Sequence, residues 1–211
     1  MTARPALYVL AGVNGAGKSS VGGHLLEQAG LAWFNPDTFA RELMAATGCD
    51  QNQANGAAWQ EGMRRLKAAM ANGDNFAFET TLGGHTVPAR IAAASATHDV
   101  LMWFCGLSSP ELHIARVRAR VQAGGHDIPE ARIRERYPAA LENLIALMPT
   151  LAHLKVYDNS TQAAPGEAIP DPILVAEMQA GRLVWPVDFE GLRQTPNWAK
   201  PLVEAALAMS G

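Results

Sequence analysis

The chain has 211 residues, of which 48% are hydrophobic and 18% are charged, and this composition excludes a disordered acidic or basic polymer. Its 17 basic and 20 acidic side chains give a formal net charge of −3. This charge argues against a protein whose whole surface binds nucleic acid or anionic membrane. The length suits one domain, and no apolar run approaches the ~20 residues that a membrane-spanning helix needs.

Predicted strands alternate with predicted helices along the first three quarters of the chain. Apolar runs that end in turn residues predict five strands, at 6–11, 32–35, 76–78, 100–107 and 154–157. The segments between them predict helices at 18–29, 37–46, 51–72, 86–96, 109–123 and 129–148. This alternation is typical of an α/β fold with an open, mostly parallel sheet and helices on both faces.

The last fifty residues have a different pattern. A loop is predicted over 162–172, followed by a small hairpin whose strands, 173–177 and 182–185, flank Ala180-Gly181. A helix over 197–209 closes the chain. We therefore expect a core over residues 1–160 and a C-terminal extension over 161–211 packed on that core.

The strongest motif follows the first predicted strand. Gly12-Val-Asn-Gly-Ala-Gly-Lys18-Ser19 fits the phosphate-binding pattern G-x-x-x-x-G-K-[ST], with a strand before it and a helix after it. Glycines allow backbone N–H groups to surround a phosphate, and the helix N-terminus adds its positive end. We expect Lys18 to reach the β- and γ-phosphates of ATP or GTP and the Ser19 hydroxyl to ligate Mg²⁺. The predicted nucleotide contacts are Gly12, Val13, Asn14, Gly15, Ala16, Gly17, Lys18, Ser19 and Ser20.

A P-loop predicts nucleotide binding in a P-loop NTPase or kinase fold, and missing motifs narrow the class of protein. A GTPase is expected to carry Asn-Lys-x-Asp, and a transporter-type ATPase Leu-Ser-Gly-Gly-Gln; neither is present. An oligomeric motor ATPase normally has Asp-Glu after an apolar strand, whereas 76–80 supplies the single acid Glu79. A small phosphotransferase remains, which needs an acid for the acceptor hydroxyl and basic side chains on a lid.

Asp37 meets the first requirement. It comes just after the second predicted strand, at the sheet edge where the P-loop opens. A carboxylate there is placed to accept the proton of the acceptor or to orient its hydroxyl. Asp37 is also a candidate N-cap for the helix that follows, and the two roles are compatible.

An arginine-rich stretch over about 109–137 meets the second requirement. Six arginines lie within 21 positions around Gly-Gly-His-Asp-Ile-Pro, with Gly124-Gly125 as a predicted hinge. The candidates for closing on phosphate are Arg116, Arg118, Arg120, Arg132, Arg134 and Arg136, together with His126 in the hinge. The alternative is a solvated helix face with glutamates as partners.

Four motifs in this order resemble the zeta-toxin group of P-loop kinases. They are the P-loop, Asn35-Pro-Asp-Thr-Phe-Ala40, Phe78-Glu-Thr-Thr-Leu82 and Arg120-x-x-x-Gly-Gly-His-Asp-Ile-Pro-x-x-x-Ile-Arg-x-Arg-Tyr137. The resemblance covers about residues 6–160. The resemblance implies ATP- or GTP-dependent phosphorylation of a hydroxyl of UDP-N-acetylglucosamine. It also makes a cognate antitoxin protein a candidate partner.

The resemblance further implies a role for individual residues. Lys18 and Ser19 would hold the nucleotide and Mg²⁺, and Asp37 would be the base. Asn35, Glu79 and Thr80 would line the acceptor site. Arg120 and Arg134 would stabilise the transferring phosphate, with Arg132 and Arg136 as alternatives for the second arginine.

Two classes of function therefore remain open. The first is a kinase of a nucleotide-sugar or of another small molecule or polynucleotide. The second is a nucleotide-dependent switch or regulatory ATPase that acts through a partner protein. The two cysteines, Cys49 and Cys105, match no metal or redox spacing, and free thiols favour a cytoplasmic location.

Overall fold

The computed structural model describes residues 4–19, 21, 22, 26, 31–162 and 170–210. The strands are β1 (Ala6–Ala11), β2 (Phe76–Thr80), β3 (Asp99–Gly106), β4 (His153–Asp158), β5 (Ile173–Gln179) and β6 (Arg182–Trp185). The helices are α2 (Pro36–Thr47), α3 (Gln51–Asn72), α4 (Thr86–Ala94), α5 (Pro110–Gln122), α6 (Glu130–Leu147), α7 (Phe189–Gln194) and α8 (Lys200–Ser210), with a 3-10 turn η1 (Met148–Thr150). Among the described residues, none of these helices combines the length and the apolar character that crossing a membrane requires.

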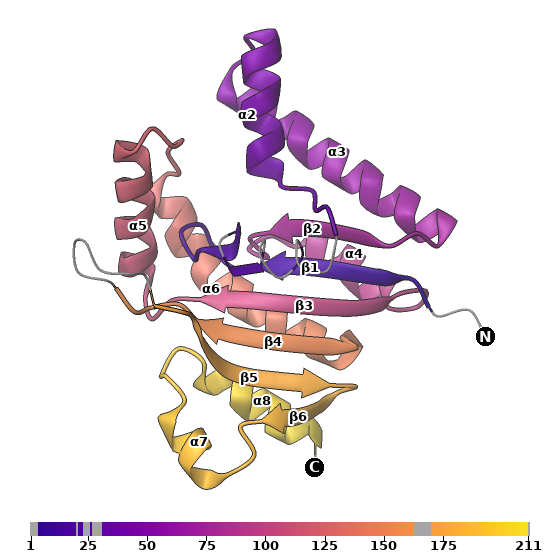
Figure 1. Ribbon diagram of the computed structural model, residues 1–211, viewed down its shortest axis with the longest axis vertical. Helices are drawn as coiled ribbons and strands as arrows, with labels where there is room; N and C mark the ends of the chain where they lie inside the picture. The colour runs from indigo at the N-terminus through magenta and orange to yellow at the C-terminus, as the bar shows by residue number, and fades with distance from the viewer. Residues whose placement is uncertain (1–3, 20, 23–25, 27–30, 163–169, 211) are drawn as a thin grey trace.

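The strands form one sheet in the order β2-β1-β3-β4-β5-β6 (Figure 1). β1 pairs in parallel with both β2 and β3, and β3 pairs in parallel with β4. Ala11, at the end of β1, lies opposite Thr80 and Phe104, so the carboxyl ends of the three strands meet at one edge of the sheet. Ligands of open α/β sheets bind outside this edge, where successive strands turn to opposite sides.

The predicted strand at 32–35 is reduced to a single contact. Phe34 forms an isolated parallel bridge with Phe78, in which its N–H donates to the Ala77 carbonyl oxygen at 2.8 Å. Pro36 begins α2 two residues later, and because proline has no N–H it cannot extend the ladder. The parallel part of the sheet therefore has four strands.

The predicted C-terminal hairpin is present, and it extends the sheet. β5 pairs antiparallel with β4, and β6 pairs antiparallel with β5 at the far edge. Trp198, just before α8, packs so closely on β3 that a Cβ at Gly106 would lie 2.2 Å from its ring. The sheet consequently has six strands instead of the five that the sequence predicted.

Helices cover both faces of the sheet. Leu7 of β1 lies in the larger core, which also contains side chains of α3, α4, α6 and α8. Leu10 of the same strand points to the other face, where it packs with the helical residue Leu26. Gly22 approaches this face so closely that a Cβ would lie 2.1 Å from the Leu10 side chain. Several residues of the predicted helix 18–29 lie outside the described part of the chain.

α2 and α3 form a helical arm that projects from the β2 side of the sheet (Figure 1). The two helices pack through small side chains, Ala40 of α2 and Ala54 and Ala58 of α3. At the root of the arm, the Arg65 guanidinium lies 5.0 Å above the centre of the Phe34 ring. The first turn of α2 is thereby held beside the sheet edge at which the P-loop begins.

Candidate active site

The P-loop follows the carboxyl end of β1 and leads into a helix that begins at Lys18. Gly12, Gly15 and Gly17 have φ angles of 140°, 84° and 84°, a region that glycine adopts without strain. A Cβ at Gly12 would lie 2.2 Å from the carbonyl oxygen of Cys105 in β3, so a side chain cannot be accommodated there. The predicted residues 12–19 form this loop, whereas Ser20 lies outside the described residues.

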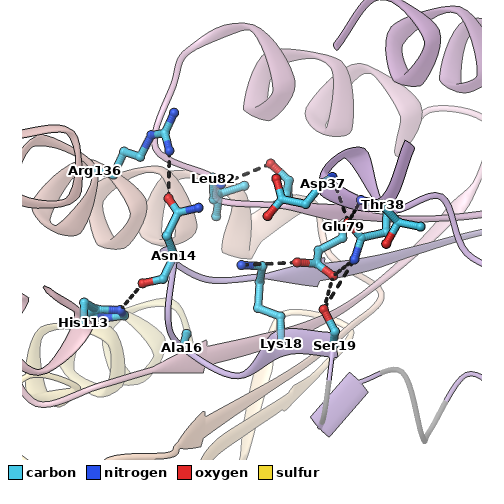
Figure 2. Close-up of polar contacts among 12 residues, drawn as sticks. Asn14, Ala16, Lys18, Ser19, Asp37, Thr38, Glu79, Leu82, His113 and Arg136 are labelled. Atoms are coloured by element: carbon cyan, nitrogen blue, oxygen red, sulfur yellow. Dashed lines mark hydrogen bonds and ion pairs between the residues drawn. The ribbon is translucent and has the colours of Figure 1, made fainter. Parts of the chain in front are cut away.

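Glu79, at the end of β2, connects the P-loop to the root of α2. Its Oε1 lies 3.4 Å from Lys18 Nζ, and both side chains are less than one tenth exposed. Its Oε2 accepts hydrogen bonds from Ser19 Oγ at 2.8 Å and from Asn35 Nδ2 at 3.0 Å (Figure 2). Glu79 and Asn35 therefore lie on the side of the P-loop where Ser19 would meet a metal ion.

The oxygen atoms beside Lys18 fit Mg²⁺ only in part. Ser19 Oγ and the Glu79 carboxylate are the hard oxygen ligands that Mg²⁺ prefers. Within the described residues, however, no group of three or more His, Cys, Asp or Glu side chains is arranged around a metal position. The arrangement suits an ion that takes its remaining ligands from nucleotide phosphates and water, as Mg²⁺ commonly does.

The helix α2 is capped by Asn35, and the expectation that Asp37 is its N-cap is wrong. Asn35 Oδ1 accepts hydrogen bonds from the backbone N–H groups of Asp37 at 2.9 Å and of Thr38 at 3.2 Å. Asp37 lies in the first helical turn, with an exposed side chain. Within the described part of the chain, its carboxylate has no hydrogen-bond or ion-pair partner. As far as the described residues go, the exposed carboxylate is therefore open to an incoming ligand.

Arg136 of α6 is a lid arginine that is hydrogen-bonded to the P-loop. Its Nη1 donates to Asn14 Oδ1 at 2.7 Å (Figure 2). Burial and the neighbouring Arg132 lower the pKa of Arg136, while the Asp37 carboxylate opposes this shift. An arginine remains charged at any accessible pH. A Cβ at Gly83 would lie 2.5 Å from Arg136 Cγ, so the loop after β2 packs directly on this side chain.

The other predicted lid arginines are held elsewhere. Arg134 Nη1 donates to Glu111 Oε1 at 2.6 Å in an exposed pair that joins α6 to α5. Arg118 pairs with Glu130 in the same way. These two arginines occupy the solvated face that the sequence left as the alternative.

Arg120 stays within the lid, where its Nη2 donates to the His126 backbone oxygen at 3.2 Å. Its Nε atom is buried and has no hydrogen-bond partner among the described atoms. Arg116 lies nearer to the P-loop: its Nη2 donates to the Thr161 carbonyl oxygen at 3.1 Å, and its Cβ would lie 3.5 Å from a Cβ at Gly15. Arg132 is exposed on α6.

Thr80 supports the loop that follows β2. Its Oγ1 accepts a hydrogen bond from the N–H of Leu82 at 3.1 Å, and Leu82 has a φ of 57°, which is unusual for this residue type. Asn143 of α6 holds the same loop by donating to the carbonyl oxygens of Leu82 at 2.7 Å and Gly84 at 3.0 Å. The structure thus gives Thr80 a role in shaping the loop that packs on Arg136.

Two residues of the site were not predicted from the sequence. His113 of α5 is 1% exposed, and its Nδ1 lies 2.8 Å from the Asn14 carbonyl oxygen. Asn159, which follows β4, donates from Nδ2 to the Ala16 carbonyl oxygen at 2.9 Å. The position of Asn159 at the carboxyl end of a predicted strand was a usable signal, but His113 belongs to no motif.

Comparisons with known proteins concern the family and the fold of the chain. Residues 7–141, well over half of the chain, match a family described as AAA domain. An uncharacterized protein of Haemophilus influenzae is 35% identical over 63 residues, a match that spans 29% of this chain and 45% of that protein. The chain therefore covers less than half the length of that relative.

Solved structures with the same fold include proteins of several kinds. The complex of AvrRxo1-ORF1 with ORF2 and ATP is similar with a TM-score of 0.63 and 17% identity, over 99% of this chain and 77% of that chain. The PezAT toxin–antitoxin system of Streptococcus pneumoniae has a TM-score of 0.56 at 16% identity, over 74% and 68%. A candidate kinase from Chloroflexus aurantiacus has a TM-score of 0.52 at 16% identity, over 64% and 78%. At these identities the likeness concerns the fold.

Proposed function

The chain belongs to the AAA domain family and has a P-loop kinase-like fold, and on that premise we propose that it transfers the γ-phosphate of ATP or GTP to a hydroxyl group of a small acceptor. The observation that supports this proposal most directly is the position of Asp37. Its exposed carboxylate has no partner among the described residues, and it lies in the first turn of α2, whose cap Asn35 contacts both Ser19 and Glu79. A protein that only binds nucleotide needs no free acid at this place.

The first step is the exchange of partners at Lys18. When the phosphates occupy the P-loop, Lys18 moves from Glu79 to the β- and γ-phosphates, which present more negative charge. Ser19 and Glu79 are then free to hold Mg²⁺, which when bound neutralises charge on the phosphates. Asn35 keeps the Glu79 carboxylate oriented through its hydrogen bond.

The second step is the transfer itself. Asp37 accepts the proton of the acceptor hydroxyl as the oxygen of that hydroxyl bonds to the γ-phosphorus. The bond between the γ-phosphorus and the β–γ bridging oxygen breaks, and the electron pair leaves with the nucleoside diphosphate. Arg136 turns from Asn14 to the equatorial oxygens of the transferring group, where its planar guanidinium donates two hydrogen bonds. We assign the second lid role to Arg136 because it is the candidate that contacts the P-loop, and we keep Arg120 as a residue that would arrive on lid closure.

We further propose that the acceptor is a nucleotide-sugar such as UDP-N-acetylglucosamine. The four motifs that resemble the zeta-toxin group support this substrate, and the related folds of AvrRxo1-ORF1 bound to ORF2 and of PezAT support an antitoxin-like protein partner. In this scheme the core at 1–160 carries the chemistry and the arginine-rich lid at 109–137 closes on it. The extension at 161–211 completes the sheet edge remote from the site.

The test is a screen of acceptors by ³¹P NMR and mass spectrometry, with the protein, ATP and Mg²⁺, followed by Asp37→Asn. The variant keeps the shape of the side chain and loses the proton acceptor, so we expect transfer to fall by roughly 10²–10⁴-fold while nucleotide affinity changes less than about threefold. Asp50→Asn is the matched control, because Asp50 caps α3 away from the site and asparagine also caps well. Transfer at the wild-type rate in Asp37→Asn would remove Asp37 from the chemistry. A screen that labels no acceptor, together with nucleotide-dependent binding of a protein, would favour the switch.

A further inference from the structure

Asn14, in the middle of the P-loop, is held by both helices of the lid. Its backbone carbonyl oxygen lies 2.8 Å from His113 Nδ1 of α5, and its side-chain Oδ1 accepts the hydrogen bond from Arg136 of α6 (Figure 2). One loop residue therefore connects the phosphate site to two separate elements. The Arg136 contact is part of the proposed transfer step, whereas the His113 contact has no role in it.

α5 lies against the P-loop at this point. A Cβ at Gly15 would lie 2.8 Å from the His113 carbonyl oxygen and 3.3 Å from Val117 Cγ2, so the helix backbone leaves no space for a side chain. Tyr137 packs on the His113 ring in a T-shaped contact with ring centres 5.6 Å apart. The Tyr137 hydroxyl donates to the Leu107 carbonyl oxygen at 3.2 Å. The imidazole is thus fixed on several sides.

The hydrogen bond between His113 and Asn14 has one possible direction. A carbonyl oxygen only accepts, so the proton must be on Nδ1. Burial lowers the pKa of His113 to about 4 against the opposing effect of the hydrogen bond to Asn14, and Lys18 and Arg116 lower it slightly further, so the ring is neutral at pH 7. A neutral imidazole with its proton on Nδ1 is a fixed donor at this position.

The orientation of one peptide group follows from this contact. In a trans peptide the C=O of one residue and the N–H of the next point in opposite directions. When His113 holds the Asn14 carbonyl oxygen on the α5 side of the loop, the N–H of Gly15 must point to the other side. That is the inside of the loop, where backbone N–H groups meet a phosphate.

We propose that His113 is a positioning residue for the nucleotide, which turns the Asn14–Gly15 peptide so that the Gly15 N–H faces the phosphates. The inference rests on the nucleotide-binding part of the proposed function and is independent of the acceptor. Its test therefore measures nucleotide affinity, so that a failure here leaves the phosphotransfer proposal standing.

Two substitutions separate this role from simple packing. In His113→Asn the amide Nδ2 takes the place of the ring Nδ1 and can donate to Asn14, whereas in His113→Gln the amide reaches further and occupies the place of Nε2. Isothermal titration calorimetry should show that His113→Asn binds ATP within threefold of the wild-type affinity. His113→Gln should bind ATP about tenfold more weakly, because a tenfold loss of affinity corresponds to the loss of one buried hydrogen bond. The KM for ATP should rise about tenfold in His113→Gln while kcat changes less than threefold, and adenosine, which has no phosphate, should bind all three proteins equally.

His98→Gln is the control for loss of a buried histidine. His98 is also 1% exposed and contacts the Asp74 carbonyl oxygen and Thr97, remote from the P-loop. The His98→Gln substitution should lower the thermal stability of the protein and leave its ATP affinity unchanged. Equal ATP affinities in His113→Asn and His113→Gln, or a loss that adenosine shares, would overturn the proposal.

A measurement on the wild-type protein needs no variant. The ¹⁵N chemical shifts and couplings of the His113 ring report which nitrogen carries the proton. We expect the Nδ1–H form throughout the pH range from 6 to 8. A ring protonated on Nε2 alone has no hydrogen to donate to Asn14 and would overturn the assignment even where a variant fails to fold.

Discussion

Replacing Glu79 by glutamine tests the ion pair between Glu79 and Lys18 of the P-loop. The substitution removes the negative charge beside Lys18 and keeps one oxygen that can accept a hydrogen bond from Ser19 or Asn35. At the observed separation of 3.4 Å, the attraction between two unit charges is about 5 kcal/mol for an effective dielectric constant near 20. Removal of one partner from a buried pair typically costs about 3–5 kcal/mol, because the remaining charge is left without compensation.

We take about 3 kcal/mol as the loss of stability, since the retained hydrogen bond offsets part of the effect. In a protein of this size, each 1 kcal/mol corresponds to about 2–4 °C in Tm, so the nucleotide-free variant should melt about 6–12 °C below the wild type. ATP phosphates give Lys18 a new partner, and they no longer have to displace a carboxylate. ATP without Mg²⁺ should therefore raise the Tm of Glu79→Gln more than it raises the Tm of the wild type.

Differential scanning calorimetry in EDTA, with and without ATP, measures both effects. Glu177→Gln is the matched control, because Glu177 is a partly buried carboxylate of β5 that pairs with His153 and Lys155 far from the P-loop. Its response to ATP should equal that of the wild type. An unchanged Tm of Glu79→Gln without ATP, together with a wild-type response to ATP, would show that the Lys18–Glu79 pair does not stabilise the protein.

Arg136→Lys should lower kcat by on the order of 10²–10³-fold with a few-fold change in nucleotide affinity, because lysine cannot donate two hydrogen bonds from one planar group. Arg134→Lys should change kcat less than threefold, since Arg134 pairs with Glu111 at the surface. The reverse order of the two steady-state rates would assign the transfer role to Arg134. Burial raises the pKa of Cys105 to about 12. A maleimide at pH 8 should therefore label Cys49 quickly and Cys105 only after unfolding. Fast labelling of both thiols would contradict the burial of Cys105. The pKa of Cys105 in the folded protein exceeds its usual value of about 9. This thiol therefore contributes stability that is complete below pH 9 and is lost as the pH rises toward 12. Chemical denaturation at a series of pH values measures this loss.

The parts of the fold that depend on local pattern were predictable from the sequence. The P-loop, the parallel order of strands and helices, and the α3 boundaries at 51 and 72 follow from motif, apolar runs and capping residues. The strand at 32–35 was not predictable in its extent, because an apolar run does not reveal whether a neighbouring strand is within reach. Similarly, the C-terminal hairpin has the same local pattern whether it stands apart or extends the sheet.

The arrangement of the site depended on tertiary contacts that spacing does not contain. Arg132, Arg134 and Arg136 alternate along one stretch of helix, so only the docking of α6 decides which one meets the P-loop. Glu79 and Asn35 were expected at the acceptor, and the structure places them beside Ser19 because β2 and the root of α2 converge there. The P-loop residues of the site could therefore be predicted from the sequence, whereas the lid arginine that meets them could not.

The central position of β1 has a consequence for the order in which the site is completed during synthesis. β1 is made before its two neighbours in the sheet, which begin at Phe76 and Asp99. The residues that hold the phosphate loop come later still, with Arg136 on α6 and Asn159 after β4. Contacts so distant in sequence form slowly and only once the intervening chain exists. A growing chain on the ribosome therefore carries the glycine-rich loop before it carries the residues that hold that loop, and a nascent fragment that ends before Asn159 has the motif without one of its supports.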